Sequence, residues 1–120
     1  MSEARFSNTV KTEWLDGNKR EMRLLEEVFF DDGKGGIWTA ESGDIIDGAS
    51  IPKFLWHIVG SPFVGKYRRA SVLHDVYCKN KKVNSAAVHR MFCDAMCCDD
   101  VTETKAKLMY NAVRWFGPRF

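Results

Sequence analysis

The sequence has no long apolar run. No stretch approaches the roughly 20 apolar residues that a membrane-spanning helix needs, and the first residues, Met1-Ser2-Glu3-Ala4-Arg5, lead into no segment of the signal-peptide type. We therefore expect no transmembrane segment and no secretion by a signal peptide. A protein made and kept in a cytosol fits these absences.

A strong net charge is also missing, because 18 basic and 16 acidic residues leave a formal charge of +2. No bulk electrostatic field favours nucleic acid, so nucleic acid is the least favoured of the candidate partners. If the protein bound nucleic acid, its affinity would fall steeply as the salt concentration rises. Basic residues do cluster locally, and we interpret both clusters as solvated helix ends or loops: Lys66, Arg68 and Arg69, then Lys79, Lys81 and Lys82.

The cysteines lack the spacing of a secreted disulfide framework, and we expect reduced core thiols at Cys78, Cys93, Cys97 and Cys98. Zinc is an alternative, because His74 with Cys78 and His89 with Cys93 are each one helical turn apart. In the helix hairpin described below, however, Cys78 lies near the bend and Cys93 roughly 12 Å further along. Since one zinc ion holds its sulfur ligands at about 2.3 Å, zinc is less favoured than calcium.

Length and pattern predict one α+β domain over residues 1–120, with a β-rich part at 1–46 and a helical part at 52–117. The first part reads as a small antiparallel meander with strands at 6–15, 20–30 and 36–39. The second reads as a bundle of three to four helices at about 53–59, 65–80, 84–99 and 102–116.

The helices at 65–80 and 84–99 are joined by a short connection, which predicts an antiparallel hairpin. Inward-facing residues recur at helical spacing on both, with Asn84 and Thr102 or Thr104 as candidate helix caps. His74 and His89 lie equally far from the bend near residues 81 and 82. We therefore expect the two imidazoles to face each other as a catalytic pair.

A metal site is predicted beside this pair. Asp75 is turned by roughly 100° from His74 around the helix and would look toward the preceding segment, which contains Asp47 and Gly48. The carboxylate of Asp47 and the backbone carbonyl of the conformationally free Gly48 suit a hard cation such as calcium. A metal ion beside a histidine is an arrangement that can hydrolyse a substrate. Alternatively, Asp-Gly is a common turn and Ser50 before Pro52 a common helix start.

The most apolar stretch of the chain is residues 54–64. We expect most of it to be core, with Trp56 packing against the helix pair. The functional alternative is an apolar wall for a substrate, formed by Trp56, Phe63 and Tyr67.

Several of these segments together resemble a family of unknown function, number 1353, known mainly from tailed phages and prophages. The likeness is carried by Asp47-Gly48-Ala49-Ser50-Ile51-Pro52, Trp56, residues 67–70 leading into Leu73-His74-Asp75, Arg90 with Phe92, and residues 112–117. It implies a phage or prophage origin, with the protein in the host bacterial cytoplasm or associated with the virion, and it brings no established activity.

A more distant likeness is to phospholipases A2, which use an Asp-Gly-x-Ser segment, a His-Asp helix and an antiparallel helix with an aspartate before Phe. It implies calcium ligands at Asp47, Gly48 and Asp75, and a water-activating base at His74. His89 stands in place of the aspartate. An imidazole cannot stabilise the imidazolium as a carboxylate does, and losing that charge cost about 10⁴ in rate in a serine protease.

Two functions remain open at this point. One is a calcium-dependent hydrolase of a lipid or another ester. The other is a non-catalytic phage accessory or virion-associated protein, in which the same residues form a buried polar network and the surface binds a host or phage protein.

Overall fold

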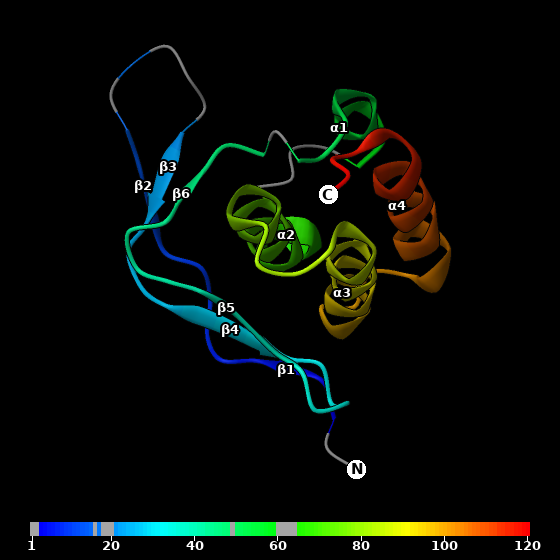
Figure 1. Cartoon of the computed structure of the whole chain (residues 1–120), viewed down its shortest axis with the longest axis horizontal. Coiled ribbons are helices and arrows are strands. Elements are labelled where there is room, and N and C mark those ends of the chain that lie inside the picture. The colour runs from blue at the N-terminus through cyan, green and yellow to red at the C-terminus, as the bar shows by residue number, and fades with distance from the viewer. Residues whose placement is uncertain (1–2, 16, 18–20, 49, 60–64) are drawn as a thin grey trace.

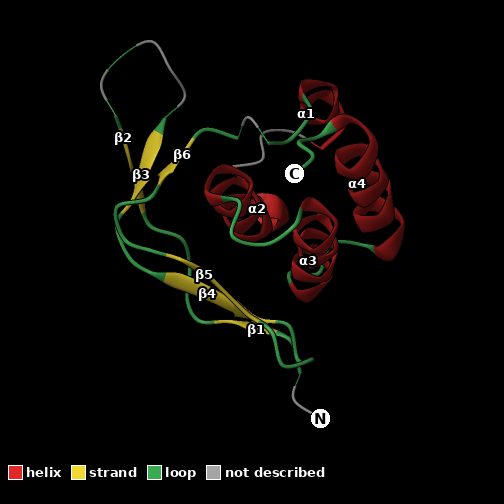
Figure 2. Ribbon diagram, viewed as in Figure 1, coloured by secondary structure: helices red, strands yellow, loops and turns green. Residues whose placement is uncertain are grey.

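The computed structural model describes residues 3–15, 17, 21–48, 50–59 and 65–120. Within them, antiparallel strands precede helices along the chain, so the predicted α+β class is confirmed (Figure 2). The strands form two sheets, ordered β1-β4-β5 and β2-β3-β6. Their bounds are β1 Arg5–Phe6, β2 Thr12–Trp14, β3 Met22–Leu24, β4 Val28–Asp31, β5 Ile37–Ala40 and β6 Ile45–Ile46.

The strands predicted at 6–15 and 20–30 are each divided between the two sheets, so two antiparallel sheets with non-consecutive strand neighbours replace the predicted single meander. Apolar side chains of the second segment are buried in alternation, at Met22, Leu24, Val28 and Phe30. Glu26 stands at the position that would continue this alternation. It instead pairs with Lys11 at 3.2 Å in solvent, beside the bend of the first segment. A charged residue at the inward position thus ends the strand.

The helices follow the predicted boundaries closely: α1 Lys53–Val59, a 3₁₀ turn at Gly65–Tyr67, α2 Arg68–Asn80, α3 Ser85–Cys98 and α4 Glu103–Phe116. Asn84 caps α3 by accepting a hydrogen bond from the Ala87 amide at 2.9 Å, and Thr102 caps α4. In the described part of the chain, none of these helices has the length and apolar character needed to cross a bilayer.

Helix α2 is the centre of the molecule. Every residue from Ala70 to Cys78 is buried, which is typical of a helix covered on all sides. Figure 1 shows α2 between the strands and α3, with α4 beyond α3 and the carboxyl terminus returning toward α1 and α2. Polar side chains on α2 therefore find their partners within the protein, and this placement creates the site.

Candidate functional site

The α2–α3 hairpin brings the two predicted histidines together. His74 Nε2 lies 2.8 Å from His89 Nδ1. The outer nitrogens are also bonded, because His74 Nδ1 lies 3.0 Å from Ser50 Oγ and His89 Nε2 lies 3.0 Å from the Pro118 carbonyl oxygen. His74 is fully buried and His89 is 2% exposed. Four groups, at Ser50, on α2, on α3 and at Pro118 after α4, thus form one hydrogen-bonded chain, which we call the relay.

The partners at its ends fix the direction of the relay, and we assign the tautomers from them. The Pro118 carbonyl can only accept, so His89 Nε2 carries the hydrogen. In a neutral imidazole the other nitrogen is then an acceptor, so His74 Nε2 donates to His89 Nδ1. This leaves a lone pair on His74 Nδ1, to which the Ser50 hydroxyl donates. Every hydrogen bond of the relay is therefore donated in the same direction, from Ser50 to His74, from His74 to His89 and from His89 to Pro118.

Burial keeps both imidazoles neutral, as this assignment requires. Loss of solvation and, to a smaller extent, the neighbouring His89 together lower the pKa of His74 from 6.5 to about 3. The pKa of His89 is also lowered, chiefly by burial, although its bond to Pro118 opposes the shift. At neutral pH His74 is accordingly a neutral base with its lone pair directed at Ser50.

Cys78, one turn after His74, carries a thiol close to the relay. Its sulfur lies 3.7 and 3.8 Å from the two His74 ring nitrogens. Burial and the negative charge of Asp75 raise the pKa of the thiol to about 12, so the reactive thiolate is suppressed. Cys78 is therefore part of the wall of the site.

Asp75 faces the 47–50 segment, as the helical rotation predicts. Its Oδ2 accepts the Asp47 amide hydrogen at 2.9 Å and its Oδ1 that of Ser50 at 3.3 Å. Gly48, at the turn, has a φ of 76°, a conformation open to glycine with little strain. The fully buried carboxylate thus pins this turn to α2 and places the Ser50 hydroxyl against His74.

The charge of Asp75 is balanced by Lys79. The lysine Nζ lies 3.3 Å from Asp75 Oδ2 and 3.3 Å from Asp47 Oδ1, and it donates to the Ile45 carbonyl oxygen at 3.2 Å. An ammonium group thus bridges the two carboxylates that were predicted to hold calcium.

As arranged, these residues do not fit calcium, which takes six to eight oxygen ligands. Both Asp75 oxygens are engaged, and the Gly48 carbonyl accepts the Ile51 amide hydrogen at 3.1 Å. Within the described ranges no cluster of three or more His, Cys, Asp or Glu side chains is gathered for a metal. We derive no step from a metal, and calcium binding at Asp47, Gly48 and Asp75 stays a prediction.

A pocket of about 140 Å³ opens beside the relay, lined by Ser50, Asp75, Cys78, Lys79 and Pro118. Neither Trp56 nor Tyr67 lines it, and both side chains are half-buried against the core. Phe63 lies outside the described residues. The predicted apolar wall therefore does not border this pocket, which has charged and small side chains instead.

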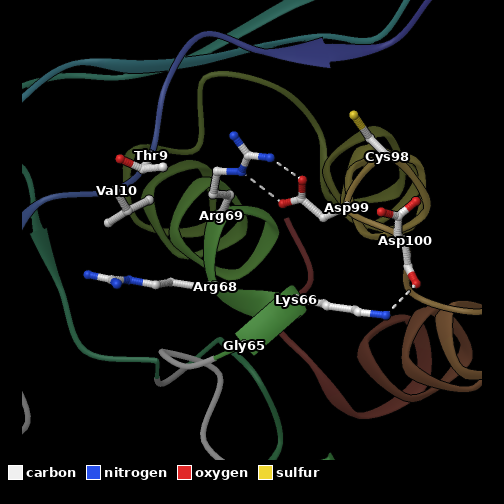
Figure 3. A pocket seen from close by; sticks show the side chains of 9 residues that line it. All are labelled: Thr9, Val10, Gly65, Lys66, Arg68, Arg69, Cys98, Asp99 and Asp100. Carbon is white, nitrogen blue, oxygen red and sulfur yellow. Dashed lines mark hydrogen bonds and ion pairs between the residues drawn. The ribbon is translucent and has the colours of Figure 1, made fainter.

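A larger pocket of about 520 Å³ lies at the first turn of α2, where one basic cluster was noted (Figure 3). Two of its basic side chains are bonded within the chain: Arg69 holds Asp99 through two nitrogens, and Lys66 donates to the Asp100 carbonyl oxygen at 3.4 Å. These contacts tie α2 to the end of α3, which is a structural role for the cluster.

Sequence reasoning missed three members of the site. Ser50 was interpreted as a helix start and Lys79 as part of a solvated cluster, and Pro118 lies just beyond the helix predicted at 102–116. The i,i+4 spacing of Asp75 and Lys79 is a signal that was present in the sequence. The contacts of Ser50 and Pro118 depend on how distant segments pack together, and no local sequence pattern predicts them.

Comparison with known proteins finds one matching family and two uncharacterized relatives. The model of the family described as "Protein of unknown function (DUF1353)" matches residues 22–113. The chain is 40% identical over 114 residues to the uncharacterized protein y4jT of Sinorhizobium fredii (strain NBRC 101917 / NGR234), covering 94% of this chain and 34% of that protein. It is 37% identical over 106 residues to the uncharacterized protein y4iH of the same strain, covering 88% and 44%.

The chain thus spans less than half the length of these two relatives. No solved structure matches it. The more distant resemblance to phospholipases A2 stays a prediction. The family match covers most of the chain, including the whole α2–α3 hairpin and the 47–52 turn, and the chain belongs to the DUF1353 family of proteins of unknown function.

Proposed function

We propose that the chain is a small hydrolase of ester bonds, in which His74 is the general base and His89 orients it. The observation that carries this proposal is the direction of the relay. A base must present a lone pair to a hydroxyl group while a third group holds its other nitrogen. His74 Nδ1 faces the Ser50 hydroxyl and His74 Nε2 is held by His89.

The size of the effect can be bounded. A positioned general base contributes about 10²- to 10⁴-fold when its pKa lies near the working pH, and the lowered pKa of His74 places its contribution at the low end of that range. In this site the imidazolium formed during reaction meets a neutral imidazole, so the stabilisation that a carboxylate provides is missing. We therefore expect slow turnover of activated esters.

The test compares hydrolysis of p-nitrophenyl acetate by the wild type, His74→Gln and His57→Gln. An exposed imidazole hydrolyses activated esters without any site, and His57 is exposed on α1. The proposal requires that His74→Gln abolish turnover above the rate of free imidazole and that His57→Gln retain it. Equal rates in all three proteins would overturn it.

A second candidate is the non-catalytic accessory or virion-associated protein, with a host or phage protein as its partner. The observation in its favour is that His74 is fully buried with both ring nitrogens bonded, as in a structural polar core. It predicts that His74→Gln lowers the melting temperature while the wild type shows no turnover. Phage or prophage origin belongs to this candidate and to the first alike.

A further inference from the structure

We propose that Ser50 is the nucleophile of this site and forms a covalent acyl intermediate on a short-chain ester. The inference rests on the proposed hydrolase function and deepens it. The alternative within that function is a water molecule activated directly by His74, as the likeness to phospholipases A2 implies. Three observations favour the serine.

The first observation is that Ser50 occupies the lone pair of the base. Its Oγ lies 3.0 Å from His74 Nδ1, and the opposite nitrogen is a donor to His89. An attacking water would need the same lone pair, and therefore the same position. The proton that His74 is placed to accept is that of the Ser50 hydroxyl.

The second observation is access. Of the three relay residues that use their side chains, Ser50 lines the 140 Å³ pocket, whereas His74 and His89 do not. Ser50 is 4% exposed and both imidazoles are 2% exposed or less, so a substrate entering this pocket is nearer to the serine than to either imidazole.

The third observation is how firmly the serine is held. Its own amide donates to the buried Asp75 carboxylate, and its hydroxyl is bonded to a buried ring. The preceding turn is tied to Asp75 through the Asp47 amide. A nucleophile held in this way loses little freedom when it reacts.

The pocket limits the substrate. Sites for drug-sized ligands have volumes of about 300–1,000 Å³, whereas this pocket has about 140 Å³. An acetyl or similarly short acyl group fits, whereas a long lipid chain would have to stay outside the pocket.

The chemistry proceeds in two balanced steps. Ser50 Oγ forms a bond to the carbonyl carbon while its proton passes to His74 Nδ1, and the carbon–oxygen bond to the alcohol breaks as the alcohol takes up that proton. A water molecule then adds to the acyl carbon, again giving its proton to His74. The serine oxygen leaves as a hydroxyl and the acid is released. With p-nitrophenyl acetate the leaving phenolate needs no proton, whereas the serine oxygen must take back the proton held by His74, so the acyl form should accumulate and p-nitrophenol should appear in a burst.

The experiment uses p-nitrophenyl acetate for turnover and diisopropyl fluorophosphate for labelling, with the modified residue mapped by peptide mass spectrometry. The variants are Ser50→Ala and Ser71→Ala. Ser71 is a matched control, because its hydroxyl is also buried on the hairpin but has no hydrogen-bond partner among the described residues. We expect the label on Ser50 in the wild type and in Ser71→Ala, and loss of the burst in Ser50→Ala.

The outcomes separate the two proposals. Turnover that survives in Ser50→Ala but not in His74→Gln would overturn the serine nucleophile and leave the hydrolase intact. Absence of both turnover and label in the wild type would overturn both. A label found on a cysteine or lysine, with Ser50 unmodified, would also reject this inference. Because the labelling result comes from the wild type, it holds even if Ser50→Ala fails to fold.

Discussion

His74 and Asp75 are neighbours on α2, and both are fully buried, yet they are accommodated by opposite means. His74 is neutral and takes part in a chain of hydrogen bonds with a single direction. Asp75 is paired with an ammonium group and accepts two backbone amide hydrogens. The first arrangement leaves a basic lone pair directed at a hydroxyl group, whereas the second leaves nothing unpaired.

This difference assigns the two residues separate tasks. A carboxylate with all its acceptors engaged is a positioning residue, which holds the 47–50 turn in place. A neutral imidazole with a hydroxyl on one side and a second imidazole on the other has the arrangement of a base and its orienting group. In the sequence, the pair of His74 and Asp75 suggests one combined metal and catalytic site. In the structure the two residues have separate roles: Asp75 is an anchor, which holds the turn, and His74 belongs to the relay.

The largest effect is expected at the anchor. Replacing Asp75 with Ala removes the acceptor of two amides and the partner of Lys79, so the free energy of unfolding should fall by roughly 2–4 kcal/mol. Denaturant unfolding followed by circular dichroism measures this. Asp94→Ala is the matched control, because Asp94 pairs with Lys34 at 3.5 Å on the surface and should cost under about 1 kcal/mol. Equal losses of unfolding free energy in the two variants would contradict the role of Asp75 as an anchor.

Replacing His89 with Asp should make His74 a more effective base. A carboxylate beside His74 Nε2 would stabilise the imidazolium, so the pKa of His74 should rise and kcat should increase by roughly tenfold or more while KM changes little. The pH profile of kcat distinguishes this from a structural effect, because its acidic limb should move to higher pH. A variant with unchanged kcat and pH profile would show that His89 does not act through His74.

Acid should weaken the relay between pH 7 and 5. The pKa of His74 is about 3 in the folded protein and about 6.5 when unfolded, so the unfolded state binds more protons in between. Stability is then complete above pH 6.5 and falls as the pH drops toward 3, at up to roughly 1 kcal/mol per pH unit from this residue. Urea unfolding from pH 7 to 5 should show this slope in the wild type and a smaller one in His74→Gln. Identical slopes would mean that His74 binds protons in the fold as it does in the unfolded chain, which contradicts the lowered pKa.

The smallest effect is expected for calcium on the wild type, because Lys79 already bridges Asp47 and Asp75. Millimolar calcium should leave the melting temperature unchanged in the wild type and raise it in Lys79→Met, where the carboxylates are released. Calorimetric titration of the wild type and Asp75→Ala provides the reverse check. Binding to the wild type that disappears in Asp75→Ala would establish the metal site predicted from the sequence.

The helical half of the fold could be predicted because its signals are local. Asn84 and Thr102 mark helix starts, and the short connection after α2 fixes the antiparallel hairpin. The meeting of His74 with His89 follows from their equal distances from that bend. The strands were harder, since their pairing depends on partners far along the chain and a single charged residue, Glu26, redirects one of them.

The relay could be predicted only in its middle. Helical spacing gives the two histidines, but the ends of the relay come from a turn and from the segment after α4. Ser50 reaches His74 because Asp75 holds the turn, and Pro118 reaches His89 because the chain folds back after α4. Such contacts depend on tertiary packing and have no period in the sequence.

The direction of the relay is the central claim, and the tautomers of the two histidines test it most directly. Long-range proton–nitrogen correlation NMR on protein labelled with ¹⁵N in its histidines distinguishes the protonated ring nitrogen of each residue. At pH 7 we predict that both His74 and His89 are neutral and carry their hydrogen on Nε2. A hydrogen on Nδ1 of His74, or a charged ring at either position, would contradict the account.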